Sequence, residues 1–287
     1  MEEAKAEHTI STVRACRIVE LSTSAAYYKS RKDDSEVIAK LQSLAEQHPT
    51  RGFDNYFGRI RNEGLKWNHK RVKRLYNLLN LNIRRKHKRR LPNRKKIPLE
   101  QPETINIKWS MDFMSDSLTN GRKFRTFNLI EDFNREVLAV EADTSLPAKR
   151  VIRVLDRVIW ERGKPDAIRV DNGPEFISNA LAEFCEKHSI ELQFIQPGKP
   201  MQNGYIERFN RTYREDVLDA YLFSSLKQVR ELSEEWKQDY NAFHPHQSLQ
   251  GYSPIGFRQA VESGKLALHK ATQSLPHITA GSNNDKN

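Results

Sequence analysis

Residues 105–113 read Ile-Asn-Ile-Lys-Trp-Ser-Met-Asp-Phe, an apolar stretch that carries one acid, Asp112. Isoleucine, tryptophan and phenylalanine favour a pleated, half-buried segment, so the stretch predicts a β-strand. An unpaired carboxylate is costly to bury inside such a strand. Asp112 therefore indicates a site at which something compensates its negative charge.

The residues that follow predict four more strands, separated by helices. Short apolar runs predict strands at 124–130, 137–142, 168–170 and 192–195, and helical patterns cover 147–162, 174–188 and 201–218. Gly121 lies in the first turn and residues 132–135 form the second, so the first three strands are expected to pair as antiparallel hairpins. The later alternation of helix and strand predicts an α/β layer.

Two further acids lie where ligands of α/β proteins usually gather. Asp171 follows the strand 168–170 and precedes a turn into the next helix. Glu207 lies on the helix 201–218, about 100° round from its apolar stripe, and is expected to face a cleft. Three carboxylates on separate elements suit Mg²⁺ or Mn²⁺, and two such ions can drive displacement at a phosphodiester. The alternative is that each acid has a structural role. Asp112 would be an acid of the strand, Asp171 would make the turn and cap the next helix, and Glu207 would pair with Arg211 four residues later.

Positive charge is concentrated ahead of these acids. The formal net charge is +11, yet residues 51–96 alone hold 17 Lys or Arg against two acids, so the rest of the chain is net negative. This segregation predicts a module that grips phosphates beside a module rich in carboxylates. Residues 84–96 hold nine Lys or Arg and no acid, which predicts a solvated linker with phosphate contacts. A merely solubilising tether is the alternative.

Short helices are expected before this linker. The first thirty residues read as two helices around a turn, weakly helix-turn-helix-like, with Val13, Cys16 and Val19 on one face. Three helices follow between residues 35 and 79, and Asn68 is expected to cap the third. The outward face of that third helix is basic and is expected to contact DNA phosphates through Lys70, Arg71, Lys73 and Arg74.

Several other site classes are disfavoured. Cys16 and Cys185 are far apart and lack metal-ligand spacing, so neither a disulfide framework nor a zinc site is expected. His244 and His246 could suggest a metal site, but no carboxylate or cysteine accompanies them at ligand spacing. The N-terminus has no signal-peptide layout, and no apolar run approaches the roughly 18 residues of a membrane span. We expect a soluble, intracellular protein.

Several motifs resemble those of one known family. The 35 residues between Asp171 and Glu207, with Asp112 on an upstream strand, resemble the D,D(35)E core of retroviral integrases and related insertion-sequence transposases. The chain most resembles the second-frame, orfB-type transposases of insertion-sequence family three, from about residue 10 to residue 260. The motifs that carry the likeness are Trp109-Ser110-Met111-Asp112-Phe113, Asp171-Asn172-Gly173-Pro174-Glu175-Phe176, Gln196-Pro197-Gly198-Lys199-Pro200, Tyr205 to Asn210, and Tyr240-Asn241 to Ser248-Leu249.

The resemblance implies an α/β fold: an RNase H-like integrase core, with a mixed five-stranded sheet flanked by helices, preceded by small all-α helix-turn-helix-like DNA-binding modules. It implies a DDE transposase that cleaves and joins DNA strands of an insertion sequence. Asp112 would bridge two Mg²⁺ or Mn²⁺ ions per active site, Asp171 would hold one ion and Glu207 the other. No covalent enzyme–DNA intermediate is expected.

Further DNA contacts are implied on both sides of the catalytic core. Arg214 matches the family's basic position seven residues after the catalytic glutamate, and Gln202 and Asn203 match a polar pair that would line the DNA end. Helix capping is the alternative for this pair. The remaining predicted contacts are Lys199, Arg211, Arg84, Arg85, Lys86, Lys88, Arg89 and Arg90. His244 departs from the family, which usually has Arg there, and would weaken a charge contact or make it pH-dependent.

The chain is therefore expected to comprise six parts. These are a helix-turn-helix-like segment (1–32), a helical DNA-binding domain (33–83), a basic linker (84–104), the catalytic core (105–222), a helical extension (223–262) and a disordered tail (263–287).

The expected partners are the double-stranded DNA of element ends and target, further copies of the chain, and the upstream-frame transposase product; no membrane is expected. The expected location is the bacterial cytoplasm, with the nucleoid. Two alternatives remain open: an RNase H-like nuclease that cuts without joining, and a catalytically silent DNA-binding regulator.

Overall fold

The computed structural model describes residues 11–27, 33–83, 101–173, 176–196 and 200–266. Several residues for which DNA contacts are predicted lie outside these ranges, namely Arg84, Arg85, Lys86, Lys88, Arg89, Arg90 and Lys199. Most of the predicted basic linker and of the predicted C-terminal tail also lies outside them.

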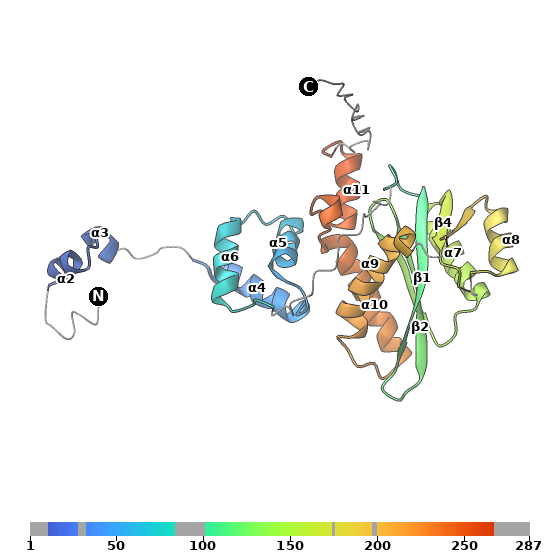
Figure 1. Ribbon diagram of the computed structural model, residues 1–287, viewed down its shortest axis with the longest axis horizontal. Coiled ribbons are helices and arrows are strands. Elements are labelled where there is room, and N and C mark those ends of the chain that lie inside the picture. Colours follow the sequence, from blue (N-terminus) through green and yellow to red (C-terminus); the bar gives the residue numbers. More distant parts are fainter. Residues whose placement is uncertain (1–10, 28–32, 84–100, 174–175, 197–199, 267–287) are drawn as a thin grey trace, which may run out of the picture.

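A mixed five-stranded sheet forms the centre of the catalytic core (Figure 1). Its strands are β1 (Lys108–Ser117), β2 (Lys123–Glu131), β3 (Val137–Asp143), β4 (Ala167–Val170) and β5 (Glu191–Phe194), in the spatial order β3-β2-β1-β4-β5. β2 pairs antiparallel with both β1 and β3, whereas β4 pairs parallel with both β1 and β5. All five predicted strands are confirmed. The first begins at Lys108 rather than at residue 105, because Asn106 has a φ of 63° that interrupts extended backbone.

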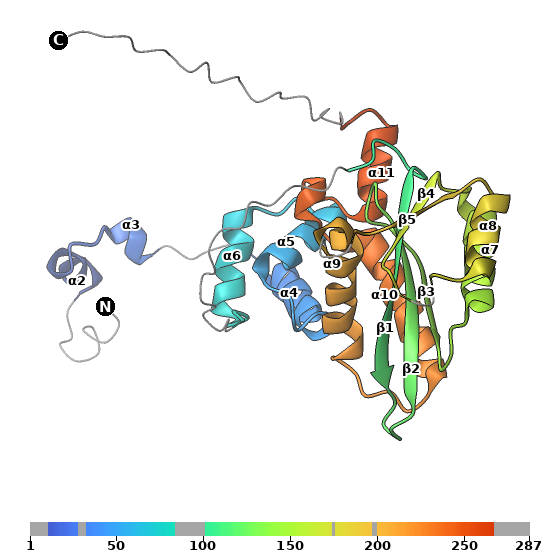
Figure 2. The same cartoon turned by 45° about the vertical axis from the view of Figure 1, so that its right-hand side comes forward.

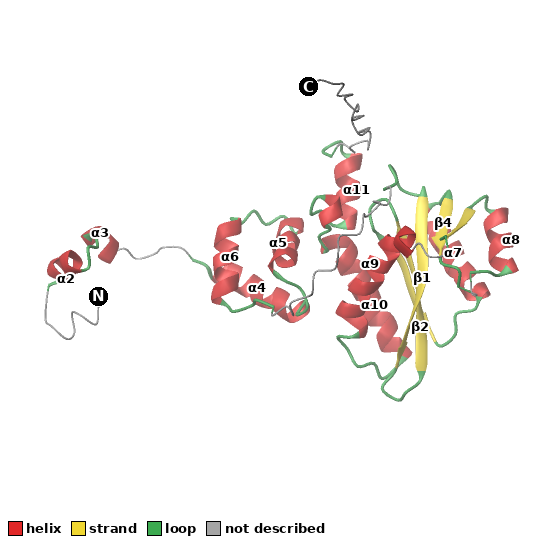
Figure 3. Cartoon of the chain, viewed as in Figure 1, coloured by secondary structure: helices red, strands yellow, loops and turns green. Residues whose placement is uncertain are grey.

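Helices cover both faces of this sheet (Figure 3). One face carries α7 (Ala148–Arg162) and α8 (Asn179–Lys187), and the other carries α9 (Gly204–Tyr213) and α10 (Leu226–Phe243). Each interface has its own apolar core, the first around Trp109 and Leu155 and the second around Phe209 and Trp236. Burial of these two layers holds the core together.

One predicted helix boundary was wrong, and one predicted helix has its predicted extent but three helix types. α8 begins at Asn179 rather than at residue 174, because Ser178 caps it through a hydrogen bond from the Leu181 N–H to Oγ at 3.3 Å. The single helix predicted at 201–218 consists of a 3₁₀ turn, η1 (Pro200–Asn203), then α9, then a π-helical segment, η2 (Arg214–Leu218). Its predicted apolar stripe is nevertheless buried: Ile206, Phe209, Tyr213 and Val217.

The N-terminal helices form a domain with its own apolar core. These helices are α4 (Ser35–Gln47), α5 (Phe53–Asn62) and α6 (His69–Leu78), as predicted. Asn68 caps α6, since its Oδ1 accepts from the backbone N–H groups of Lys70 and Arg71.

The two short helices predicted further upstream are present, and the face with Val13, Cys16 and Val19 is only partly buried. α2 (Thr12–Ile18) and α3 (Thr23–Ala26) are present, but Val13 and Val19 are 50% and 49% exposed, whereas Cys16 is buried. The reason is size: α3 is a single turn, so it can cover only part of α2.

The helical domain docks against the α9 side of the catalytic core, as Figure 2 shows. Arg51, just before α5, hydrogen-bonds Asp216 of η2 through Nε at 2.9 Å and Glu215 through Nη1 at 3.1 Å. Arg59 of α5 forms an ion pair with Asp239 of α10 at 2.8 Å. A Cβ built on Gly58 would lie 2.5 Å from Pro245, so glycine is needed where α5 meets the chain beyond α10.

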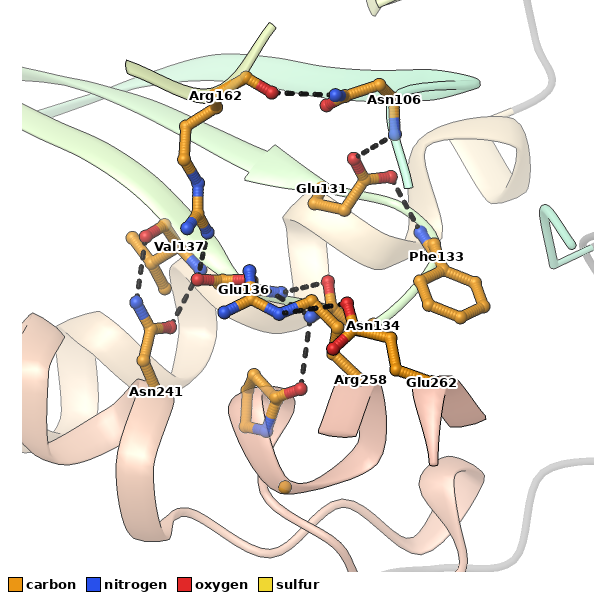
Figure 4. Close-up of polar contacts among 12 residues, drawn as sticks. Asn106, Glu131, Phe133, Asn134, Glu136, Val137, Arg162, Asn241, Arg258 and Glu262 are labelled. Carbon is orange, nitrogen blue, oxygen red and sulfur yellow. Dashed lines mark hydrogen bonds and ion pairs between the residues drawn. The ribbon is translucent and has the colours of Figure 1, made fainter. Parts of the chain in front are cut away.

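Beyond α10 the chain forms η3 (Gln247–Leu249) and α11 (Pro254–Glu262), which close over the turn between β2 and β3. A buried polar network fastens this turn (Figure 4). Glu136 forms ion pairs with Arg162 of α7 and with Arg258 of α11. Glu131 accepts three hydrogen bonds, yet burial raises its pKa to about 7. Through Trp109, Arg162 and Arg258, the network connects β1, α7 and α11 to the turn between β2 and β3. Among the helices of the described ranges, none is long and apolar enough to cross a membrane.

Candidate active site

Asp112 is fixed by a relay of amides that runs from the sheet to α9. Asp112 lies in β1 directly opposite Asn128 of β2. Asn210 of α9 donates from Nδ2 to Asp112 Oδ2 at 2.7 Å, and Asn128 donates from Nδ2 to Asn210 Oδ1 at 2.7 Å. The backbone N–H of Phe113 donates to the other carboxylate oxygen at 2.8 Å. Both oxygens of Asp112 are therefore oriented, and α9 is held against the centre of the sheet.

The other two predicted acids lie on neighbouring elements. Asp171 directly follows β4, the parallel neighbour of β1, and its Oδ1 accepts from the Gly173 N–H at 2.9 Å. Glu207 lies in the first turn of α9, three residues before Asn210, so the two share a helix face. The Glu207 side chain is exposed, and within the described ranges it forms no hydrogen bond or ion pair, including the alternative pair with Arg211.

The three acids are close enough to interact electrostatically. The pKa of Asp112 is raised to about 6, mainly because burial disfavours its charged form. The negative charges of Asp171 and Glu207 raise this pKa further, while the hydrogen bonds from Phe113 and Asn210 lower it. As the side chains stand, the described part of the chain has no group of three or more His, Cys, Asp or Glu that could hold one ion.

The donor set fits a hard divalent cation. All three side chains offer carboxylate oxygens, the ligands that Mg²⁺ and Mn²⁺ prefer. The half-buried Asp112 carries a charge that its surroundings disfavour, and a cation would relieve that penalty. The unpartnered Glu207 can change rotamer to approach an ion without breaking a contact to another described residue.

A layer of buried charges lies beside the site and supports the start of α9. Asp132 accepts from Ser110 Oγ at 2.6 Å and pairs with Arg169 of β4 at 3.0 Å. Burial raises the pKa of Asp132, and the Arg169 charge opposes that effect. Arg135 places its guanidinium carbon 3.4 Å from the centroid of the Tyr205 ring, in the first turn of α9. These contacts restrain the turn that carries Glu207.

The predicted basic face of α6 is largely committed to contacts within the protein. Arg71 and Arg74 both form ion pairs with Asp34. Lys73 places its Nζ 4.2 Å from the centroid of the Phe53 ring. Lys70 is exposed. Among the described residues, Lys70 is the one of these four side chains with no ion pair or ring contact.

The polar pair before α9 does not cap the helix. Asn203 occupies the N-cap position but makes no side-chain capping hydrogen bond. Its side chain is buried, and its Oδ1 has no hydrogen-bond partner among the described residues. Gln202 instead accepts from the backbone N–H of Gln196 at 2.9 Å. Neither Gln202 nor Asn203 therefore caps α9, and their contact with DNA stays a prediction.

The two predicted basic residues at the end of α9 differ in surroundings. Arg211 is exposed. Arg214 pairs with Asp116 of β1 at 3.2 Å and donates to the backbone carbonyl of Ser115 at 3.0 Å. Their predicted DNA contacts stay predictions.

Sequence reasoning missed Asn128 and Asn210. A signal for each was present: Asn128 is a polar residue inside the apolar run 124–130, and Asn210 follows Glu207 at helical spacing. The sequence alone does not fix the register between β1 and β2, so it could not show that Asn128 lies opposite Asp112.

The strand order, with one acid on the central strand, one after its parallel neighbour and one on the helix that packs across both, defines an RNase H-like integrase core. Comparisons with known proteins agree. Two models described as "Integrase core domain" match residues 102–200 and 188–254. In a structure of a simian T-cell lymphotropic virus intasome, one chain aligns with a TM-score of 0.50 over 84% of this chain and 80% of that one, at 14% identity, which shows the fold.

Relatives by sequence extend over nearly the whole chain. A 31.7 kDa protein of insertion element IS407 from Burkholderia multivorans is 36% identical, covering 96% of this chain and 98% of that protein. A candidate transposase for insertion sequence element IS150 from Escherichia coli is 24% identical, covering 84% of this chain and 91% of the relative. The chain belongs to the insertion-element transposases that carry an integrase core domain.

Proposed function

We propose that Asp112, Asp171 and Glu207 form one divalent-metal site, at which this transposase cleaves and joins DNA strands at the ends of its insertion element. The observation that carries the proposal is the placement of the acids: Asp112 lies in β1, Asp171 directly follows the parallel neighbour β4, and Glu207 lies on α9, the helix whose Asn210 hydrogen-bonds Asp112 at 2.7 Å. Burial and the charges of both other acids raise the pKa of Asp112 in the same sense. Three carboxylates gathered around the middle of β1 and the carboxyl end of β4 suit a cation.

Each acid has a distinct role. Asp112, oriented through both oxygens, would bridge two Mg²⁺ or Mn²⁺ ions, while Asp171 would hold one and Glu207 the other. When bound, two such ions activate the attacking oxygen and stabilise the departing oxygen of a phosphodiester. The chain itself supplies orientation: the amide of Asn210 holds Asp112, and the Gly173 N–H holds Asp171.

The proposed reaction has two steps at the same site. Hydrolysis of one strand at the element end leaves a 3′-hydroxyl, and that hydroxyl then attacks a phosphodiester of the target. The second step exchanges one phosphodiester for another, so it needs no ATP. No side chain of the protein forms a covalent bond to DNA.

We propose double-stranded DNA, at the element ends and at the target, as the substrate. Two ends must be held together, so several copies of the chain would assemble into a complex comparable to the viral intasome. The upstream-frame product stays a proposed partner, and Lys70 and the linker residues stay proposed phosphate contacts. The proposed location is the bacterial cytoplasm, at the nucleoid.

A strand-transfer assay tests the proposal. Labelled element-end DNA and target plasmid are incubated with the chain and Mg²⁺, alongside Asp112→Asn, Asp171→Asn and Glu207→Gln. Each substitution is expected to abolish joined product while leaving DNA binding intact. Cleaved but unjoined DNA from the intact chain would instead favour a nuclease. Binding without any chemistry would favour a regulator.

A further inference from the structure

A large cleft separates the helical domain from the catalytic core. Its volume is about 1220 Å³. One wall consists of residues of α5 and α6, and the other consists of residues of α9, the end of α10 and the segment 244–252. Pockets for small molecules usually measure about 300–1,000 Å³, so this cleft has room for part of a polymer.

Positive charge lines the cleft. Arg61 of α5 and Arg208 of α9 are both exposed, and within the described ranges neither forms an ion pair. Lys73 reaches the same cleft from α6. Arg51 also lines it, but Asp216 and Glu215 offset its charge. Asp54 is the acid among the lining residues, so the cleft has a net positive charge that suits phosphates.

Aromatic side chains accompany these cations. Tyr252 is 37% exposed at the cleft, and Phe57 lies beneath the guanidinium of Arg61 at 5.3 Å from its ring centroid. Unpaired bases stack on such aromatic rings and on arginine planes. The bases of a duplex are already stacked on one another, so a duplex could not stack its bases on these rings.

Two histidines lie in the wall of the cleft with their unpartnered nitrogens buried. His244 Nδ1 and His246 Nε2 are buried, and neither has a hydrogen-bond partner among the described residues. Burial lowers the pKa of His246 to about 3, so its imidazole is neutral near pH 7. The histidines therefore add no charge to the wall of the cleft, and Arg61, Lys73 and Arg208 supply the attraction for phosphate.

The cleft and the candidate active site share α9, because Arg208, which lines the cleft, directly follows Glu207 on that helix. We propose that the cleft binds an unpaired strand of DNA, with Arg61, Lys73 and Arg208 at the phosphates and Tyr252 stacked on a base. The proposal rests on the proposed function in that the strand belongs to the element-end DNA. The binding itself requires neither metal nor catalysis.

Fluorescence anisotropy with a labelled single-stranded oligothymidine and with a duplex of equal length, both in EDTA, tests the proposal. Tyr252→Ala is expected to weaken single-strand binding by about tenfold, the loss of one stacked base, and to leave duplex binding unchanged. Arg61→Gln combined with Arg208→Gln should lower the slope of log affinity against log salt by about 1.4, the value for two single-strand phosphate contacts. Arg153→Gln, an exposed arginine of α7 on the opposite face of the sheet, is the matched control.

Photo-crosslinking locates the strand directly. An oligothymidine containing 5-bromodeoxyuridine should crosslink to the peptide that contains Tyr252, as read by mass spectrometry, and the double arginine variant should lose that crosslink. Circular dichroism confirms that each variant is folded. Equal loss of single-strand and duplex binding in Tyr252→Ala, no loss at all, or a crosslink elsewhere would overturn the proposal. Loss of strand transfer with the crosslink retained would count against the proposed function alone.

Discussion

Replacing Asp112 by asparagine is expected to stabilise the metal-free protein while it abolishes strand transfer. The pKa of Asp112 rises from 3.8 to about 6 in the folded chain, a penalty of about 3 kcal/mol on the charged form. Asparagine removes that penalty but presents an NH₂ group to one of the two donors, Phe113 N–H or Asn210 Nδ2, at a cost of about 1 kcal/mol. The net gain in unfolding free energy is about 2 kcal/mol.

The pH dependence of this gain has a definite sign. Because the folded pKa lies above the unfolded one, the penalty is absent below about pH 4, grows as pH rises and is complete above about pH 6. Urea unfolding of wild type and Asp112→Asn in EDTA at pH 5 and pH 8 measures it. Asp156→Asn, in which the replaced acid is 59% exposed on α7, is the control. Two results would refute the idea that the charge of Asp112 is disfavoured. In the first, Asp112→Asn is less stable than wild type at pH 8. In the second, the difference in unfolding free energy between variant and wild type is the same at pH 5 and pH 8.

The remaining predictions concern the groups around the site. Asn210→Ala should lower the strand-transfer rate about 10- to 100-fold, because the Asn210 amide orients the carboxylate of Asp112; an unchanged rate would contradict this role. Arg51→Gln should cost about 3 kcal/mol in urea unfolding, because it leaves the 4% exposed Asp216 without its cation; a cost near zero would show that the two parts are not docked in solution. His244 and His246 are held neutral by burial, with pKa values lowered below 6.5, so their stabilisation is complete above pH 6.5 and lost as pH falls. Unfolding free energy should drop by about 3 kcal/mol between pH 6.5 and pH 5 from this pair, and the drop should shrink in His246→Asn.

Much of the fold could be predicted because the spacing of apolar residues along the sequence shows which side of each strand or helix is buried. The apolar runs of the five strands and the stripe of α9 needed no knowledge of distant contacts. Asp112 and Asp171 could be found for a related reason: a carboxylate within or at the end of an apolar strand stands out against its neighbours. The exposed position of Glu207 also agreed with its place on the helical wheel.

The features that sequence could not predict depend on contacts between distant segments. The relay from Asn128 through Asn210 to Asp112 joins residues up to 98 positions apart. Capping by Ser178 competed with the helical pattern predicted from residue 174 and set the true start of α8. The basic pattern of α6 likewise concealed that Asp34, outside that helix, pairs with Arg71 and Arg74.

The most direct test of the metal site is the substitution Asp112→Cys, assayed for strand transfer in Mg²⁺ and in Mn²⁺. A thiolate is a poor ligand for Mg²⁺ and is tolerated better by softer ions. If Asp112 binds the ion, joined product should be lost in Mg²⁺ and partly restored in Mn²⁺, whereas Asp112→Leu should be inactive in both. Joined product formed by Asp112→Cys to the same extent in Mg²⁺ and in Mn²⁺ would contradict a role for Asp112 as a metal ligand.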